Sequence, residues 1–141
     1  MVLSISLLLT CIFLILSGIH FIWATGSTWG FNNALPQKEN GERVLNPRKI
    51  DSLIVAIGLL TMGVFYLFMT GKLDWPLPRI VVKYGQWIIP SIFLIRGIGD
   101  FKYAGLFRKI KGTAFAKCDA RFFTPLCFLI GILGFIIAYL K

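Results

Sequence analysis

The feature that most constrains this chain is a series of four long apolar windows separated by shorter polar segments. An α-helix needs roughly 20 apolar residues to cross the hydrocarbon core of a bilayer. The windows cover residues 2–24, 50–71, 80–99 and 122–140. The first has no charged side chain, and the second has only Asp51, at its start. The third is the least apolar, because Lys83, Pro90 and Arg96 interrupt it.

These windows predict an integral membrane protein without a soluble domain. Of the 141 residues, 57% are hydrophobic and 15% are charged, which is too apolar for an ordinary soluble domain. We therefore expect an all-α fold, a four-transmembrane-helix bundle that forms one polytopic membrane domain over residues 1–141. The first window exceeds the apolar core of a signal peptide and lacks a basic leader, so we expect it to remain as a span.

The net charge of +9 indicates membrane topology rather than a nucleic-acid partner, because loops rich in lysine and arginine stay on the cytoplasmic side. Segments 25–49 and 100–121 contain ten of the fifteen lysines and arginines. With four spans these segments share one side, which predicts that both termini lie outside. If the third window did not span, three spans would remain and the termini would lie on opposite sides; we favour four. The short segment between the second and third windows contains Trp75, a residue type typical of membrane boundaries.

The segment after the third window predicts an amphipathic helix in the third loop. Its apolar residues recur with the period of an α-helix: Tyr103, Leu106, Phe107, Ile110 and Ala114. Its cations fall on the remaining face: Lys102, Arg108, Lys109 and Lys111. This pattern is typical of a helix that lies in the membrane interface, with its cations on anionic lipid headgroups. Membrane lipids are therefore an expected partner.

The connectivity predicts a polar pocket at the leaflet that bears the basic loops. Ionisable groups at membrane depth usually pair with one another, line a cavity or have a function. In an up-and-down bundle, polar residues at the ends of all four spans come to the same leaflet. The expected ligand-binding residues are His20, Trp23, Asp51, Arg96, Asp100 and Asp119.

Each of these residues also has a structural explanation. Arg96 and Asp100 are spaced i, i+4 and can form an ion pair. An aspartate at a helix C-terminus opposes the helix dipole, so we expect Asp100 to have a further cationic or N–H partner. Asp51 and Asp119 can instead satisfy the N-termini of helices, and His20 can be a packed hydrogen-bonding group.

The cysteines, the histidine and the glycines form no motif that indicates a specific chemistry. The three cysteines form no C-x-x-C pair, and the lone histidine and scattered aspartates have no metal-ligand spacing. We therefore expect no metal and no cofactor. Gly131 and Gly134 permit close helix approach, but they do not form a G-x-x-x-G dimerisation motif.

The third window and the loop that follows it resemble a known family. The residues concerned are RGIGDFKYAGLF at 96–107, TAFAKCD at 113–119 and TPLC at 124–127. As a set, with His20 and Trp23 in the first window, they resemble the small bacterial membrane family named domain of unknown function 3995. The resemblance implies four spans in a bacterial cytoplasmic membrane and no established activity.

Three functions remain open at this point. The first is a binding protein for an anionic amphiphile or lipid, with Arg96 on its phosphate and Asp100 orienting that arginine, in an accessory or protective role in the envelope. The second is a membrane-embedded enzyme acting on a lipid-soluble substrate, with His20 as general acid or base. The third, ranked last, is a small transporter, which would need a carboxylate deep in the bundle.

Overall fold

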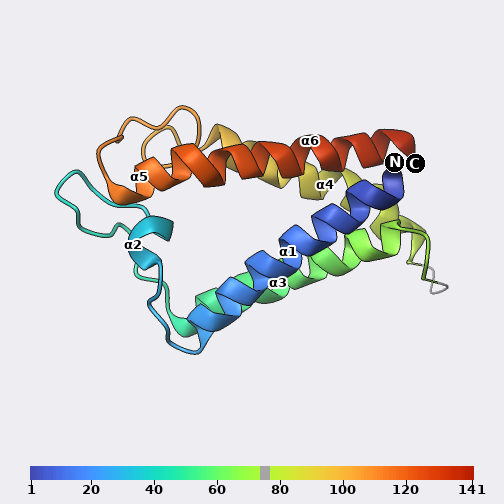
Figure 1. Cartoon of the computed structure of the whole chain (residues 1–141), viewed down its shortest axis with the longest axis horizontal. Helices are drawn as coiled ribbons and strands as arrows, with labels where there is room; N and C mark the ends of the chain where they lie inside the picture. Colours follow the sequence, from blue (N-terminus) through green and yellow to red (C-terminus); the bar gives the residue numbers. More distant parts are fainter. Residues whose placement is uncertain (74–76) are drawn as a thin grey trace. The chain divides into compact units, whose positions relative to one another are not determined.

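The computed structural model describes residues 1–73 and 77–141 (Figure 1). In chain order its elements are α1 (Val2–Ala24), α2 (Phe31–Ala34), α3 (Lys49–Met69), α4 (Arg79–Ile98), α5 (Ala114–Cys118), the π-helix η1 (Asp119–Phe123) and α6 (Thr124–Leu140). Among the described residues, strand-like pairing is limited to an isolated bridge between Gln37 and Arg43. The expected all-helical fold is therefore confirmed.

Among the described residues, three helices are long and apolar enough to cross a membrane. They are α1, α3 and the continuous helix Ala114–Leu140 formed by α5, η1 and α6, with mean hydropathies of 2.6, 2.2 and 2.3. α4 forms a helix over the third apolar window, but Lys83, Pro90 and Arg96 make it more polar. The helices are those of a membrane protein, while the fourth span and the placement of both termini outside stay predictions. Trp75, the expected interfacial residue, lies outside the described residues.

The chain divides into two compact units. Unit 1 consists of Met1–Ser27, Pro47–Pro90 and Leu133–Lys141, and unit 2 of Thr28–Asn46 and Ser91–Ile132. In unit 1, α1 and α3 lie side by side (Figure 1). Small and polar residues are buried along both helices: Ser6, Thr10 and Ser17 in α1, and Ser52, Ala56 and Gly63 in α3. Such residues let the backbones of membrane helices approach closely.

Hydrogen bonds between side chains and backbone join α1 to α3. Thr10 Oγ1 donates to the Gly63 carbonyl at 3.3 Å, and Ser17 Oγ donates to the Ala56 carbonyl at 2.8 Å. The rings of Phe13 and Tyr66 stack at 5.7 Å. Water cannot replace these bonds inside a bilayer, so they define the register of the pair, although each contributes only about 0.6 kcal/mol.

Gly134 permits a second close approach within unit 1. A Cβ atom on Gly134 of α6 would lie 2.7 Å from both the Pro90 Cβ in α4 and the Tyr66 hydroxyl in α3. Pro90 is fully buried. The glycine expected to allow close helix packing therefore does so, and the proline ring is part of that packing.

The first loop in unit 2 is more ordered than a plain surface connection. α2 packs against α5, and Phe31 is buried. The Arg43 guanidinium lies 5.6 Å from the centre of the Phe31 ring and donates to Asn32 Oδ1 at 2.8 Å. These contacts tie the loop to the start of the last helix.

That helix begins well before the predicted span at residues 122–140. Its first element, α5, starts at Ala114, where Thr113 Oγ1 accepts the N–H of Ala116 at 3.1 Å. A threonine in this position satisfies one of the unpaired N–H groups of a helix N-terminus. The hydropathy pattern missed this start because the first turns of the helix still contain Lys117, Asp119 and Arg121.

Replacing Gly63 by leucine should weaken the packing of α1 on α3. A Cβ on Gly63 would lie 3.1 Å from the Phe13 Cβ, whereas Gly58 on the same helix has open space around it. We expect Gly63→Leu to lower the free energy of unfolding by about 1–3 kcal/mol, measured by thermal unfolding in detergent micelles. Gly58→Leu is the matched control and should have little effect. Equal effects of both variants would contradict this packing.

Candidate functional site

The centre of the candidate site is the carboxylate of Asp119, which is fully buried. Asp119 begins the π turn η1, in which the N–H of Thr124 bonds to the Asp119 carbonyl five residues earlier. Pro125 follows directly; it lacks an N–H, and its ring would clash with the Arg121 carbonyl in a regular α-helix. The wider π turn accommodates this mismatch.

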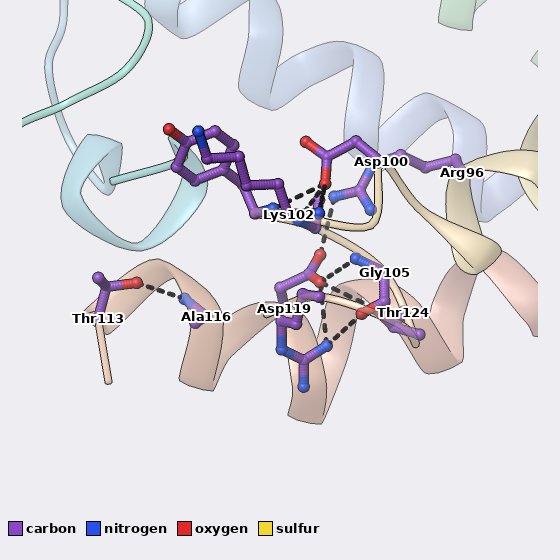
Figure 2. Close-up of polar contacts among 11 residues, drawn as sticks. Arg96, Asp100, Lys102, Gly105, Thr113, Ala116, Asp119 and Thr124 are labelled. Atoms are coloured by element: carbon purple, nitrogen blue, oxygen red, sulfur yellow. Dashed lines mark hydrogen bonds and ion pairs between the residues drawn. The ribbon is translucent and has the colours of Figure 1, made fainter. Parts of the chain in front are cut away.

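Four donors converge on the Asp119 carboxylate (Figure 2). Its Oδ1 accepts from Arg96 Nη2 at 2.8 Å. Its Oδ2 accepts from the Gly105 N–H at 2.8 Å, from Thr124 Oγ1 at 3.0 Å and from Arg108 Nη1 at 3.4 Å. We call these five residues the Asp119 cluster. The cluster joins the end of α4, the following loop and the last helix through one buried charge.

Burial makes these bonds essential to the local structure. An isolated carboxylate in an apolar environment loses its hydration at a cost of many kcal/mol, so it must be paired and hydrogen-bonded. Asp119 is paired with two guanidinium groups, and bonds between charged partners are about twice as strong as neutral ones. The cluster therefore satisfies the charge of Asp119 and also holds the loop against the helix.

Asp100 organises the beginning of the same loop. Its Oδ1 accepts the backbone N–H groups of Lys102, Tyr103 and Ala104 at 3.0, 2.7 and 2.9 Å. Partial burial tends to raise the pKa of Asp100, but these three N–H groups and the charge of Arg96 outweigh it and hold the pKa below its usual range. The expected N–H partner of Asp100 is thus confirmed, and Lys102 provides one of the three.

The amphipathic helix expected over residues 103–114 does not form, and that prediction was wrong. Residues 99–113 are an irregular loop. Gly99 and Gly105 have φ values of 92° and 85°, and they pack so closely that a Cβ on Gly99 would overlap the Ala104 carbonyl. The N–H of Leu106 bonds back to the Gly97 carbonyl at 2.8 Å. Backbone donors that a helix would need are therefore bonded to Asp100, Asp119 and the end of α4.

The loop also turns Arg108 inward. The Arg108 side chain is only 13% exposed and pairs with Asp119, and its Nη1 donates to the Gly105 carbonyl at 2.6 Å. The sequence pattern predicted that Arg108 contacts lipid headgroups. The structure corrects this prediction, because Arg108 pairs with Asp119. The other three cations, Lys102, Lys109 and Lys111, are exposed. Their predicted contact with lipid headgroups stays a proposal.

The structure brings together some of the predicted site residues. Arg96 pairs with Asp119 at 2.8 Å rather than with Asp100, which corrects the i, i+4 pairing. All three residues belong to unit 2. Arg108 and Gly105 were not predicted as members of this site. Thr124 was expected at the same leaflet as Arg96 and Asp119, at the start of the fourth span, and the wider π turn before Pro125 brings it to the Asp119 carboxylate.

The remaining predicted residues belong to unit 1. His20 Nδ1 lies 2.8 Å from the Leu16 carbonyl of its own helix, and its ring meets the Trp23 ring edge-on at 4.8 Å. Asp51 Oδ2 accepts the N–H of Arg48 at 2.8 Å, which makes it a cap of α3. His20 is thus a packed hydrogen-bonding group and Asp51 satisfies a helix N-terminus, which are the structural explanations that the sequence also allowed.

Two guanidinium nitrogens in the Asp119 cluster are buried without an acceptor. They are Arg96 Nη1 and Arg108 Nε. Buried polar groups without a partner are rare and call for an explanation. Within residues 1–73 and 77–141, no group of three His, Cys, Asp or Glu side chains could hold a metal ion.

Replacing Asp119 by alanine should destabilise the protein strongly, because two guanidinium groups would lose their common partner. Removing one member of a buried ion pair costs about 3–5 kcal/mol. Thermal unfolding in micelles should show this loss, while Asp51→Ala, which removes an exposed cap, should cost about 1 kcal/mol. A smaller loss for Asp119→Ala than for Asp51→Ala would contradict the central role of the carboxylate.

The order of the loop should depend on pH through Asp100. Because the folded pKa is lowered, the stabilising effect is present above the ordinary value of 3.8 and is lost as the pH falls through the folded pKa. We expect the amide resonances of Lys102, Tyr103 and Ala104 to shift in acid in micelle NMR spectra. Asp100→Asn keeps an acceptor oxygen and should remove this titration; an unchanged acid transition in that variant would assign it elsewhere.

Comparison with known proteins places the chain in a family. No curated protein and no solved structure matches it. A family model described as "Protein of unknown function (DUF3995)" matches residues 13–134, a region that contains α3, α4, the loop and the whole Asp119 cluster. The chain therefore belongs to the DUF3995 family.

Proposed function

We propose that this membrane protein binds the phosphate of an anionic amphiphile or lipid through the guanidinium groups of Arg96 and Arg108. The observation that supports the proposal is the pair of buried donors without an acceptor, Arg96 Nη1 and Arg108 Nε. Phosphate oxygens are strong acceptors, and arginine binds them through several N–H groups in one plane. Nη1 itself is buried, but the Arg96 side chain as a whole is 37% exposed, so a headgroup would approach along the exposed part of this side chain.

Asp119, rather than Asp100, takes the orienting role in this proposal. It accepts from both arginines, so each guanidinium is held before a ligand arrives. Pre-oriented donors lose less conformational entropy on binding. The two arginines exceed the single carboxylate they share, which favours a further anion beside them. A protein of this kind would have an accessory or protective role in the cell envelope.

The two alternatives receive less support. His20 bonds to its own helix and packs against Trp23, as expected of a packed side chain rather than a general acid or base. The buried carboxylate that a transporter would need is Asp119, which is already bonded to four donors. These contacts therefore favour the binding function over both alternatives.

Replacing Arg96 by glutamine should reduce the retention of anionic lipid. The full chain would be purified from native membranes in a mild detergent, and the bound phospholipid per protein measured by mass spectrometry. We expect a loss of at least about tenfold, because hydrogen bonds to charged groups contribute about 1.5–3 kcal/mol. Arg96→Lys keeps the charge and should retain part of the binding.

Arg121→Gln is the matched control. Arg121 lies in η1, as Asp119 does, but it is exposed and contacts the Phe122 ring rather than an aspartate, so its loss should leave lipid retention unchanged. Competition with inorganic phosphate would show whether the phosphate group alone is recognised or the acyl chains are also needed. Unchanged retention in both Arg96→Gln and Arg108→Gln would refute the proposal.

A further inference from the structure

A second feature, formed by other side chains than those of the Asp119 cluster, is a group of exposed apolar residues on the loop of residues 99–113. Phe101, Leu106 and Phe107 are 58%, 60% and 56% exposed. The rings of Phe101 and Phe107 stack on each other at 5.9 Å. Large apolar side chains that gather on a surface mark a site of contact with a membrane or another protein.

Exposed cations accompany these side chains. Lys102, Lys109 and Lys111 lie on the same loop and are exposed. Their ammonium groups are free of ion pairs among the residues described, whose three salt bridges involve Lys38, Arg96 and Arg108. Apolar side chains flanked by lysines are the combination that binds anionic lipid surfaces, since acyl chains accept the former and phosphates attract the latter.

The position of the loop in the chain favours the same partner. It follows α4 at Ile98 and ends where the candidate span Ala114–Leu140 begins. A segment that adjoins the end of a span lies at the level of the lipid headgroups. With Ala114–Leu140 spanning a bilayer, the loop would therefore lie next to the bilayer surface.

The backbone of the loop is held in shape before it meets a membrane. Asp100 bonds three successive N–H groups at its start, and Gly105 is bonded to Asp119. Phe101 has a φ of 62°, a conformation that is unusual for a bulky residue and persists only where the surrounding structure imposes it. The three apolar side chains are thus displayed by a fixed backbone.

We propose that the loop of residues 99–113 is a preformed wedge that inserts Phe101, Leu106 and Phe107 into the headgroup region of an anionic bilayer. Lys102, Lys109 and Lys111 contact the lipid phosphates around it. The wedge replaces the amphipathic helix as the interfacial element, and Arg108 has no part in it because it faces Asp119. The lipid contact of the wedge is distinct from binding at Arg96, so each proposal can fail without the other.

Spin labels would test the wedge in the full chain reconstituted into vesicles of phosphatidylglycerol and phosphatidylcholine. Single cysteines would be placed at Leu106 and Phe107 after replacement of Cys11, Cys118 and Cys127 by alanine. We expect both labels to be accessible to oxygen, which dissolves in lipid, and shielded from a water-soluble nickel complex. A label at Gly112, which is exposed in the same loop with open space around it, is the control and should show the opposite pattern.

Two results would overturn the proposal. Labels at residues 106 and 107 that react freely with the nickel complex would place the loop in water. Labels shielded from both reagents would place these side chains against protein. A trifluoromethyl-phenylalanine at position 107, read by fluorine NMR with the same two reagents, repeats the test with the native cysteines present.

A separate experiment tests the role of the lysines. In vesicles of phosphatidylcholine alone, the labels should lie shallower than in the anionic vesicles. Replacing Lys102, Lys109 and Lys111 together by glutamine should abolish this difference, whereas Arg121→Gln, at an exposed cation outside the loop, should leave it unchanged. An insertion depth that is the same in both lipids for the unchanged loop would refute the anionic surface as the partner.

Discussion

The interaction on which the site depends is the burial of one carboxylate, that of Asp119, among donors from three parts of the chain. Arg96 at the end of α4, Gly105 and Arg108 in the loop, and Thr124 in the last helix all bond to it. A buried charge without partners would cost more free energy than most domains have in reserve. The loop is therefore held against the helix by the same bonds that satisfy Asp119.

That constraint also separates two kinds of positive charge. Arg108 is drawn inward to the carboxylate, and it leaves one buried N–H donor, Nε, without an acceptor, as Arg96 does with Nη1. The lysines of the same loop stay exposed beside Phe101, Leu106 and Phe107. We propose a specific phosphate as the partner of the inner pair and a lipid surface as the partner of the outer set. Both surfaces rest on the same backbone, shaped by Asp100 and by the glycines at positions 99 and 105.

Hydropathy and connectivity predicted much of the fold and little of the site. The windows at residues 2–24 and 50–71 agree with α1 and α3 within two residues, because apolar length is a direct requirement of a membrane span. The amphipathic pattern of residues 103–114 failed, since Asp100 bonds the N–H groups of Lys102, Tyr103 and Ala104 at the start of the segment. The i, i+4 spacing likewise predicted an ion pair between Arg96 and Asp100, but Arg96 pairs with Asp119 instead. Arg96 and Asp119 are too far apart in the sequence for helical periodicity to predict their pairing.

By itself, the sequence determined that this chain forms long apolar helices and that its few acids near the membrane need partners. It also pointed to Arg96, Asp100 and Asp119 as residues of one region. Only the tertiary structure decided which charges pair, that Arg108 faces inward, and that residues 99–113 form a loop rather than a helix. The physical reason is that hydropathy and helical period act over neighbouring residues, whereas a buried charge selects its partners from whatever the folded chain brings within hydrogen-bond distance.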